Sequence, residues 1–194
     1  MFYAFAKFVL AIYYGLFFKM KITGLENIPH EGGALICANH LSYHDPLTVA
    51  VYCPRTVHYM GKKELFDIPV LKTIVRWLNA FAVDRNKTDL NAIKTAIKIL
   101  KSGEIVGIFA QGTRVSDGED KAAKSGAVLI AIKSCSPLIP TAIKSSYKPF
   151  SKIYVTYGKP IDFSYLKGKR LDSETLEQAT CKVMDEIKRM NMGG

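Results

Sequence analysis

The sequence lacks the features that mark several large classes of protein. Its cysteines, Cys37, Cys53, Cys135 and Cys181, are far apart and form no CxxC pair. Their spacing argues against a metal site and for a reducing compartment. The chain has no internal repeat and no linker. No small-residue cleavage site follows its apolar N-terminal stretch, so the sequence does not predict a removable signal peptide.

Acidic side chains are scarce relative to basic ones. Asp and Glu number 17 against 27 Lys and Arg, which gives a formal net charge of +10. Such a balance attracts anions, whether nucleic acid, anionic lipid headgroups or an acidic protein. The positive charge is spread along the chain without a basic-aromatic motif, so we expect no nucleic-acid partner. With 194 residues, 48% of them hydrophobic, the chain can form one domain with a full core.

Residues 1–18 are almost entirely apolar, with Lys7 as the exception. At helical spacing, a strongly apolar side lies opposite a side that carries Lys7 and Tyr14. A lysine costs about 2.5–3.5 kcal/mol at the centre of a bilayer. We therefore expect a membrane-associating helix that lies in the interface, where Lys7, Lys19 and Lys21 meet the headgroups of membrane lipids. The alternatives are a helix that spans the bilayer and a helix buried in the core.

Beyond residue 18, segments typical of strands and helices alternate. The expected strands are 19–23, 34–38, 56–61, 81–83, 104–109, 137–143 and 153–157, and the expected helices are 46–52, 69–78, 89–101, 126–133 and 173–190. Alternation of this kind is typical of an α/β fold with a largely parallel sheet. We therefore expect a single domain over residues 19–194, with a mostly parallel mixed sheet flanked by helices.

The first candidate for chemistry follows the apolar run 34–38. Asn39-His40 comes directly after that run, and Asp45-Pro46 has the form of a helix start, with Asp45 as N-cap and Pro46 at the first helical position. The spacing lets the Asp45 carboxylate fold back onto one imidazole nitrogen of His40. The other nitrogen can then take a proton from a hydroxyl. The pair lacks an obvious serine or cysteine nucleophile, so we infer that the substrate supplies the hydroxyl.

The alternative is that His40 has a structural role. A lone histidine at a strand end is more often structural than catalytic. His44 is a second candidate, but it neighbours Asp45 in the sequence, and its ring would meet that carboxylate with difficulty. We expect His30 and His58 at the surface or in loops.

Four sequence blocks together resemble those of the glycerolipid acyltransferase family. The blocks are Asn39-His40 through Asp45, which resembles the HX4D motif, then Ala82-Val83-Asp84-Arg85, then Phe109-Ala110-Gln111-Gly112-Thr113-Arg114, and last Pro137-Leu138-Ile139-Pro140. The HX4D pattern alone is weak, whereas four blocks in the family's order are specific. The likeness covers about residues 20–165.

The resemblance implies a step of phospholipid synthesis. An acyl group would pass to the free hydroxyl of a lysophospholipid, most closely 1-acyl-glycerol-3-phosphate, to give phosphatidic acid. His40 would take the proton of that hydroxyl, and Asp45 would orient His40 and stabilise its imidazolium form. The donor would be a thioester of CoA or of acidic acyl carrier protein, with no metal or other cofactor required. The enzyme would act at the cytoplasmic face of a membrane, as a peripheral or monotopic protein.

The resemblance also implies a binding site for the phosphate of the acceptor. Arg85 and Arg114 are forked cations suited to a phosphate. Gly112 and Thr113 would let backbone N–H groups and a hydroxyl approach the anion, and Lys62 is a further candidate. The alternative for each arginine is a surface salt bridge.

Gln111 and Ala110 depart from the family's third block, which is usually Phe-Pro-Glu-Gly-Thr-Arg. The carboxamide of Gln111 removes a charge and adds two N–H donors that a carboxylate lacks. We expect Gln111 to lie in or beside the phosphate pocket, and Asn39 to support the site. Two further alternatives stay open. The acceptor could be glycerol-3-phosphate or another lysolipid, or the chain could be a non-enzymatic protein that binds anionic lipid.

Overall fold

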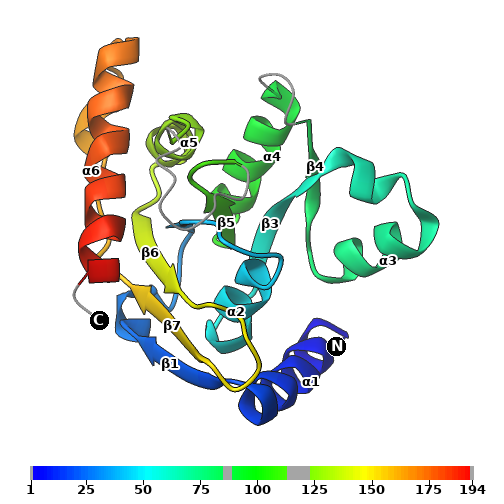
Figure 1. Ribbon diagram of the computed structural model, residues 1–194. Coiled ribbons are helices and arrows are strands. Elements are labelled where there is room, and N and C mark those ends of the chain that lie inside the picture. Colours follow the sequence, from blue (N-terminus) through cyan, green and yellow to red (C-terminus); the bar gives the residue numbers. More distant parts are fainter. Residues whose placement is uncertain (1, 85–88, 113–122, 193–194) are drawn as a thin grey trace.

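The computed structural model describes residues 2–84, 89–112 and 123–192 (Figure 1). Its strands are β1 (Lys19–Thr23), β2 (Ala34–Ala38), β3 (Val57–Lys62), β4 (Phe81–Val83), β5 (Ile105–Phe109), β6 (Leu138–Lys144) and β7 (Lys152–Tyr157). Its helices are α1 (Phe2–Phe17), α2 (Asp45–Tyr52), α3 (Pro69–Trp77), α4 (Leu90–Lys101), α5 (Gly126–Ser134) and α6 (Ser173–Met192). The expected elements are therefore confirmed, with bounds that differ by at most two residues.

Within the described ranges, all the strands belong to one sheet, in the order β1-β7-β6-β2-β5-β3-β4. Neighbouring strands are parallel except β6 and β7, which pair antiparallel. This arrangement confirms the expected mostly parallel mixed sheet. Every residue of the central strand β2 is buried, because parallel sheets are covered by helices on both faces.

Helices cover the sheet in two layers (Figure 1). Leu35 and Cys37 of β2 pack into a core that contains side chains of α4, α5 and α6. Ala34, Ile36 and Ala38 point to the opposite face, where the core contains Tyr14 of α1 and side chains of α2. The alternation follows from the two-residue period of a strand. It places α1 and α2 together on one face of the sheet.

Helix α1 turns its polar side toward the protein. The Lys7 ammonium donates a hydrogen bond to the Cys53 carbonyl (2.5 Å), and the Tyr3 hydroxyl accepts one from the N–H of Val57 (3.1 Å). Partial burial lowers the pKa of Lys7. The expectation that Lys7 meets lipid headgroups is therefore wrong, because the peptide groups after α2 supply its partner.

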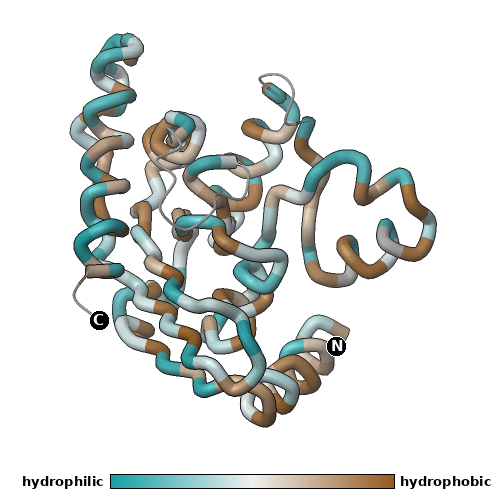
Figure 2. The backbone as a smooth tube through the Cα atoms, viewed as in Figure 1, coloured by the Kyte–Doolittle hydropathy of each residue, from teal (hydrophilic) through white to brown (hydrophobic). Residues whose placement is uncertain are grey.

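The opposite side of α1 faces outward and is apolar. Figure 2 shows hydrophobic residues along most of this helix. Phe5, Phe8 and Leu16 are between 63% and 67% exposed, which is far more than a core helix would leave uncovered. Among the residues that the structure describes, no helix combines the length and the apolarity needed to cross a membrane.

Two helix starts show how local sequence signals succeed and fail. At α4 the Asp89 carboxylate accepts hydrogen bonds from the N–H groups of Asn91 and Ala92, both at 3.0 Å, as expected of an N-cap. Helix α2 instead begins at Asp45 itself, and His44 occupies the N-cap position. The expectation that Asp45 caps this helix is wrong, because its carboxylate turns back to donors in the preceding loop.

The positions of two other histidines complete the comparison with the sequence. His30 is exposed, as expected. His58 lies on strand β3, partly buried, with its Nε2 atom 4.0 Å from a carboxylate oxygen of Glu104. This position agrees with the expected strand 56–61 and excludes a loop. The expectation of a surface position is wrong, because pairing of β3 with β5 leaves the side chain only partly exposed.

The sheet brings the ends of β2, β5, β3 and β4 to a common edge. In the register of the parallel pair β2 and β5, Ala38 lies beside Phe109. In the pair β3 and β4, Lys62 lies beside Val83. The first three sequence blocks lie at the ends of β2, β4 and β5, whereas the fourth, residues 137–140, lies at the start of β6. Sites in α/β proteins form outside the carboxyl ends of parallel strands, so this edge is the place to search for chemistry.

Candidate active site

His40 and Asp45 form a buried pair in the turn between β2 and α2. His40 Nδ1 lies 2.8 Å from Asp45 Oδ2, and the residues are 7% and 0% exposed. The structure thus brings the two residues together as their spacing predicts. Because Nδ1 faces the carboxylate, it carries the proton of the neutral ring, and Nε2 remains an acceptor. The pair can therefore accept a proton from a bound hydroxyl.

The Asp45 carboxylate also binds the backbone of its own turn. Oδ2 accepts hydrogen bonds from the N–H groups of Leu41 (2.6 Å) and Ser42 (2.8 Å). Oδ1 accepts one from the Tyr147 hydroxyl at 2.5 Å. A fully buried carboxylate needs such donors, because an unpaired buried charge is costly. The donors also fix the plane of the carboxylate that orients His40.

Tyr147 stays protonated in this environment. Burial, followed by the charge of Asp45 and the hydrogen bond to it, raises the pKa of Tyr147. The hydroxyl therefore remains a donor to Asp45 across the physiological pH range. Tyr147 lies in the segment between β6 and β7, far from Asp45 in the sequence.

Asn39 joins the same turn to the neighbouring strand β6. Its side-chain oxygen accepts a hydrogen bond from the N–H of Ile143 (2.7 Å), and its side-chain nitrogen donates to the Ile143 carbonyl (2.8 Å). These two bonds lie directly before His40 in the sequence. Asn39 therefore holds the end of β2 against β6 and fixes the backbone from which His40 projects.

An aromatic stack covers one face of the His40 ring. The Phe109 ring lies 4.0 Å from the imidazole, at an interplanar angle of 18°. Tyr59 continues the stack behind Phe109, 6.0 Å away at 10°. Gly107 makes room for it, since a Cβ atom there would lie 2.3 Å from the Tyr59 ring. The stack and the Asp45 bond together leave the imidazole little freedom to rotate.

Known proteins resemble this chain over most of its length. A family model described as "Acyltransferase" matches residues 19–144, the span from β1 to β6 that builds the site. The chain belongs to the acyltransferase family. A Bacillus subtilis protein named 1-acyl-sn-glycerol-3-phosphate acyltransferase is 39% identical and aligns over 97% of this chain and 96% of its own.

More distant members of the acyltransferase family are also similar. A Borreliella burgdorferi protein with the same name is 30% identical over 69% of this chain and 54% of its own. The crystal structure of the 1-acyl-sn-glycerophosphate (LPA) acyltransferase from Thermotoga maritima superposes with a TM-score of 0.70 at 26% identity. That superposition covers 97% of this chain and 76% of the other. The mixed α/β architecture of this chain is therefore that of the family.

Beside the dyad, a cavity of about 700 Å³ opens between the ends of β4 and β5 and the helices α4 and α5. Its wall includes Phe109, the residue that stacks on His40, together with the apolar side chains of Ile108 and Ile130. Gly112 and Lys124 contribute polar groups to the same cavity. Such a mixed lining suits a ligand with an apolar and a charged part.

Gln111 follows Phe109 and Ala110 and is 9% exposed. Its side-chain oxygen is buried and has no hydrogen-bond partner among the described residues. Gly112, which has a left-handed φ of 69°, donates its own N–H to the Phe109 carbonyl (2.9 Å) and closes a turn. An unpartnered buried acceptor is rare in folded proteins; among the described residues, the hydroxyls of Tyr59 and Ser151 share this state.

The remaining residues singled out for phosphate binding divide into two groups. Lys62, at the end of β3, forms an ion pair with Glu64, with 3.2 Å between Nζ and Oε1, and about half of each side chain is exposed. Arg85, Thr113 and Arg114 lie outside the described residues.

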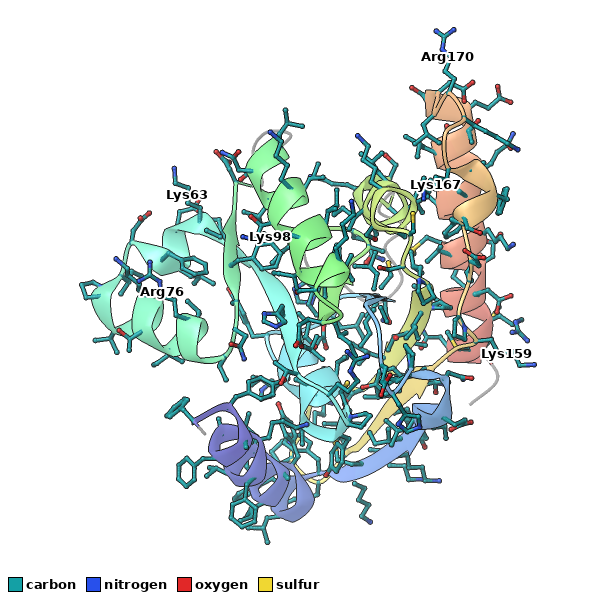
Figure 3. All side chains as sticks on the ribbon, turned by 180° about the vertical axis from the view of Figure 1, so that it is seen from behind. Lys63, Arg76, Lys98, Lys159, Lys167 and Arg170 are labelled. Carbon is teal, nitrogen blue, oxygen red and sulfur yellow. The ribbon has the colours of Figure 1, made fainter. Side chains whose placement is uncertain are left out.

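Exposed basic side chains also occur on other elements of the molecule. Lys63 and Arg76 lie near α3, Lys98 on α4, and Lys159, Lys167 and Arg170 toward α6 (Figure 3).

Sequence reasoning missed two neighbours of the dyad. Tyr147 follows β6 in a short polar segment whose composition indicates only a turn. Phe109 was treated as the apolar end of a strand, although its place beside Ala38 in the sheet puts it against His40. No local pattern could have identified Tyr147, whereas the strand-end position of Phe109 was a usable signal.

Proposed function

We propose that this chain transfers a fatty acyl group from an acyl thioester to the free hydroxyl of 1-acyl-glycerol-3-phosphate, and that phosphatidic acid is the product. The observation that carries the proposal is the buried His40–Asp45 pair, in which the Nδ1 side of the imidazole binds the carboxylate. The name and nearly equal length of the Bacillus subtilis relative support this choice of acceptor.

In the proposed step, Nε2 of His40 removes the proton of the acceptor hydroxyl as its oxygen attacks the thioester carbonyl. The new C–O bond forms, the C–S bond breaks, and the thiol leaves after it takes the proton back from the imidazolium. Asp45 stabilises that imidazolium and keeps the ring oriented. A thiolate leaves readily, so the step requires no covalent enzyme intermediate and no metal.

The donor in this proposal is acyl-CoA or acyl carrier protein. The net charge of +10 attracts either of them, since both are anionic. The cavity beside Phe109 offers apolar wall for an acyl chain. For the acceptor phosphate, the family pattern assigns Arg85, Thr113 and Arg114, and Lys124 lies beside Gly112 at the near wall.

We further propose that the enzyme binds the cytoplasmic face of a membrane peripherally, through the outward side of α1. Phe5 and Leu16 are three helical turns apart on that side, and they are 63% and 67% exposed. The polar side of α1 is held by the protein through Lys7 and Tyr3. The apolar side is thereby presented to lipid.

A direct assay tests the reaction. Purified protein, 1-acyl-glycerol-3-phosphate and acyl-CoA or acyl carrier protein should release free thiol and form phosphatidic acid in equal amounts. Glycerol-3-phosphate serves as the competing acceptor. Thiol release without phosphatidic acid, or transfer to glycerol-3-phosphate alone, would overturn the acceptor assignment. Absence of thiol release with both donors would favour a protein that only binds lipid.

Vesicle binding tests the membrane surface. The double variant Phe5→Glu, Leu16→Glu should lose binding to vesicles that contain phosphatidylglycerol, because two charges would have to enter the interface. Leu90→Glu is the matched control, since Leu90 is 63% exposed on α4, away from α1. Co-sedimentation gives the bound fraction. Equal binding by the double variant and the control would show that another surface contacts the membrane.

A further inference from the structure

A continuous set of contacts joins helix α1 to the carboxylate of the dyad. The Tyr14 hydroxyl and His44 Nδ1 are hydrogen-bonded at 2.9 Å. The His44 ring stacks on the Tyr147 ring, with centroids 5.1 Å apart and an angle of 19°. Tyr147 in turn donates to Asp45 Oδ1 at 2.5 Å. Tyr14 and Tyr147 lie far in the sequence from the adjacent pair His44 and Asp45, and the proposed reaction uses only Asp45.

Tyr147 is held in an uncommon conformation. Its φ of 52° lies in the left-handed region, which is unfavourable for a bulky residue and persists only where the surrounding structure holds it. The Ser145 hydroxyl accepts a hydrogen bond from the Tyr147 N–H (2.9 Å) and stabilises this turn. The conformation directs the ring between His44 and Asp45.

Tyr14 is fully buried although it lies on α1, the helix with the exposed apolar side. Burial raises the pKa of Tyr14, so its hydroxyl stays neutral and needs a hydrogen-bond partner within the protein. His44 supplies that partner. The packing of α1 therefore also fixes the orientation of the His44 ring, which stacks on Tyr147.

We propose that Tyr147 is a positioning residue for Asp45, and that Tyr14 acts through His44 to hold Tyr147 in place. The proposal rests on the proposed function, since it assigns these residues to the His40–Asp45 dyad. Oδ2 of Asp45 already serves His40 and two backbone N–H groups. The bond at Oδ1 is the one that sets the rotation of the carboxylate from outside its own turn.

The physical consequence is an effect on rate rather than on substrate affinity. Small displacements of a catalytic base slow proton transfer steeply, whereas none of these three residues needs to touch the acceptor. Tyr147→Phe keeps the ring on His44 and removes the donor to Asp45, together with the long contact (3.5 Å) between the hydroxyls of Tyr147 and Thr48. We expect its kcat to fall roughly tenfold to thirtyfold, with the KM for the acceptor unchanged.

Tyr14→Phe should have a smaller effect, a decrease in kcat of about threefold to fivefold, because the Tyr147–Asp45 bond remains. In the double variant Tyr14→Phe, Tyr147→Phe, the loss should equal that of Tyr147→Phe alone, because Tyr14 acts only through Tyr147. Tyr165→Phe is the matched control, since Tyr165 is 55% exposed on another part of the chain and should leave kcat unchanged.

Three outcomes would overturn the proposal: an unchanged kcat in Tyr147→Phe, a raised KM in place of a lowered kcat, or losses that multiply in the double variant. Thermal midpoints establish that each variant is folded. If Tyr147→Phe does not fold, Tyr14→Phe carries the test, because it leaves every contact of Asp45 in place.

A readout without substrate separates this proposal from the proposed function. The His40 Nδ1 proton shared with Asp45 should give a downfield proton NMR resonance, assigned by its loss in His40→Ala. We expect that resonance to shift or broaden in Tyr147→Phe and to persist in Tyr165→Phe. If the chain shows no acyl transfer but the resonance responds in this way, the reaction assignment fails and the positioning role stands. An unaltered resonance in Tyr147→Phe contradicts the positioning role.

Discussion

The turn after β2 and the turn after β5 lie side by side, yet they satisfy their polar groups in opposite ways. In the first, every described contact of the Asp45 carboxylate comes from the protein itself: His40, two backbone N–H groups and Tyr147. In the second, the buried oxygen of Gln111 has no partner among the described residues. The first turn satisfies its carboxylate through neighbouring protein groups, whereas the described residues around the second supply no partner for the buried acceptor.

The difference indicates a division of roles between the two turns. A base must be oriented in advance, because reorganisation during the reaction would cost rate. A binding group has no such need, since its partner arrives with the ligand. The arrangement therefore predicts that changes after β2 affect turnover, whereas changes after β5 affect the binding of the acceptor.

The largest expected effect comes from His40→Ala. Transfer should fall by about a thousandfold or more while the protein stays folded, because general-base catalysis contributes on that order. His30→Ala is the control, since His30 is exposed outside the site. Single-turnover rates check this, and an unchanged rate in His40→Ala would contradict the role of His40.

A smaller effect is expected at Gln111, and it should appear in the KM. Gln111→Leu should raise the acceptor KM about tenfold or more, since the loss of a hydrogen bond from the carboxamide N–H to a charged headgroup costs about 1.5–3 kcal/mol. Gln111→Glu keeps the shape and should remain active, with somewhat weaker binding of the dianionic headgroup. Initial rates over a range of acceptor concentrations separate KM from kcat.

Gln111→Glu also tests whether the two turns have separate roles. If it increases kcat about a hundredfold, which corresponds to about 2.7 kcal/mol of barrier, the turn after β5 takes part in turnover. The division of roles would then be wrong, and this chain would be an altered form of an enzyme that depends on the family's glutamate.

The smallest expected effect concerns the stability of the fold in acid. Burial lowers the pKa of His58, against the opposing influence of Glu104. The unfolded chain therefore takes up this proton first, and stability should decrease as the pH falls below the ordinary histidine value of about 6.5. His58→Gln should weaken that dependence in urea unfolding measured at about pH 7 and pH 5. An unchanged dependence would assign the loss to another group.

Much of the fold was predictable because buried parallel strands are short apolar runs that the sequence shows directly. The His40–Asp45 contact was equally accessible, since the two residues are five positions apart in a single turn. The order of the strands was not, because nothing local specifies that β1 pairs with β7. The prediction of an N-cap at Asp45 was wrong for a related reason, because the carboxylate accepts hydrogen bonds from the preceding loop.

The partners of Lys7 and Asp45 show where sequence reasoning ends. An amphipathic helix has a polar side and an apolar side, but the pattern does not say which of them faces the protein. Lys7 binds a carbonyl 46 positions away, and Asp45 binds a tyrosine 102 positions away. Such pairs depend on how the layers pack, so the structure was needed to find them.

Gly107 determines how closely the aromatic stack beside His40 can pack against β5. It lies in the middle of β5, and the absence of its side chain lets the Tyr59 ring lie against the strand. A single methyl group there would collide with the Tyr59 ring and disturb the stack that Tyr59 forms with Phe109 and His40. The packing of the imidazole therefore depends on a backbone position that carries no side chain.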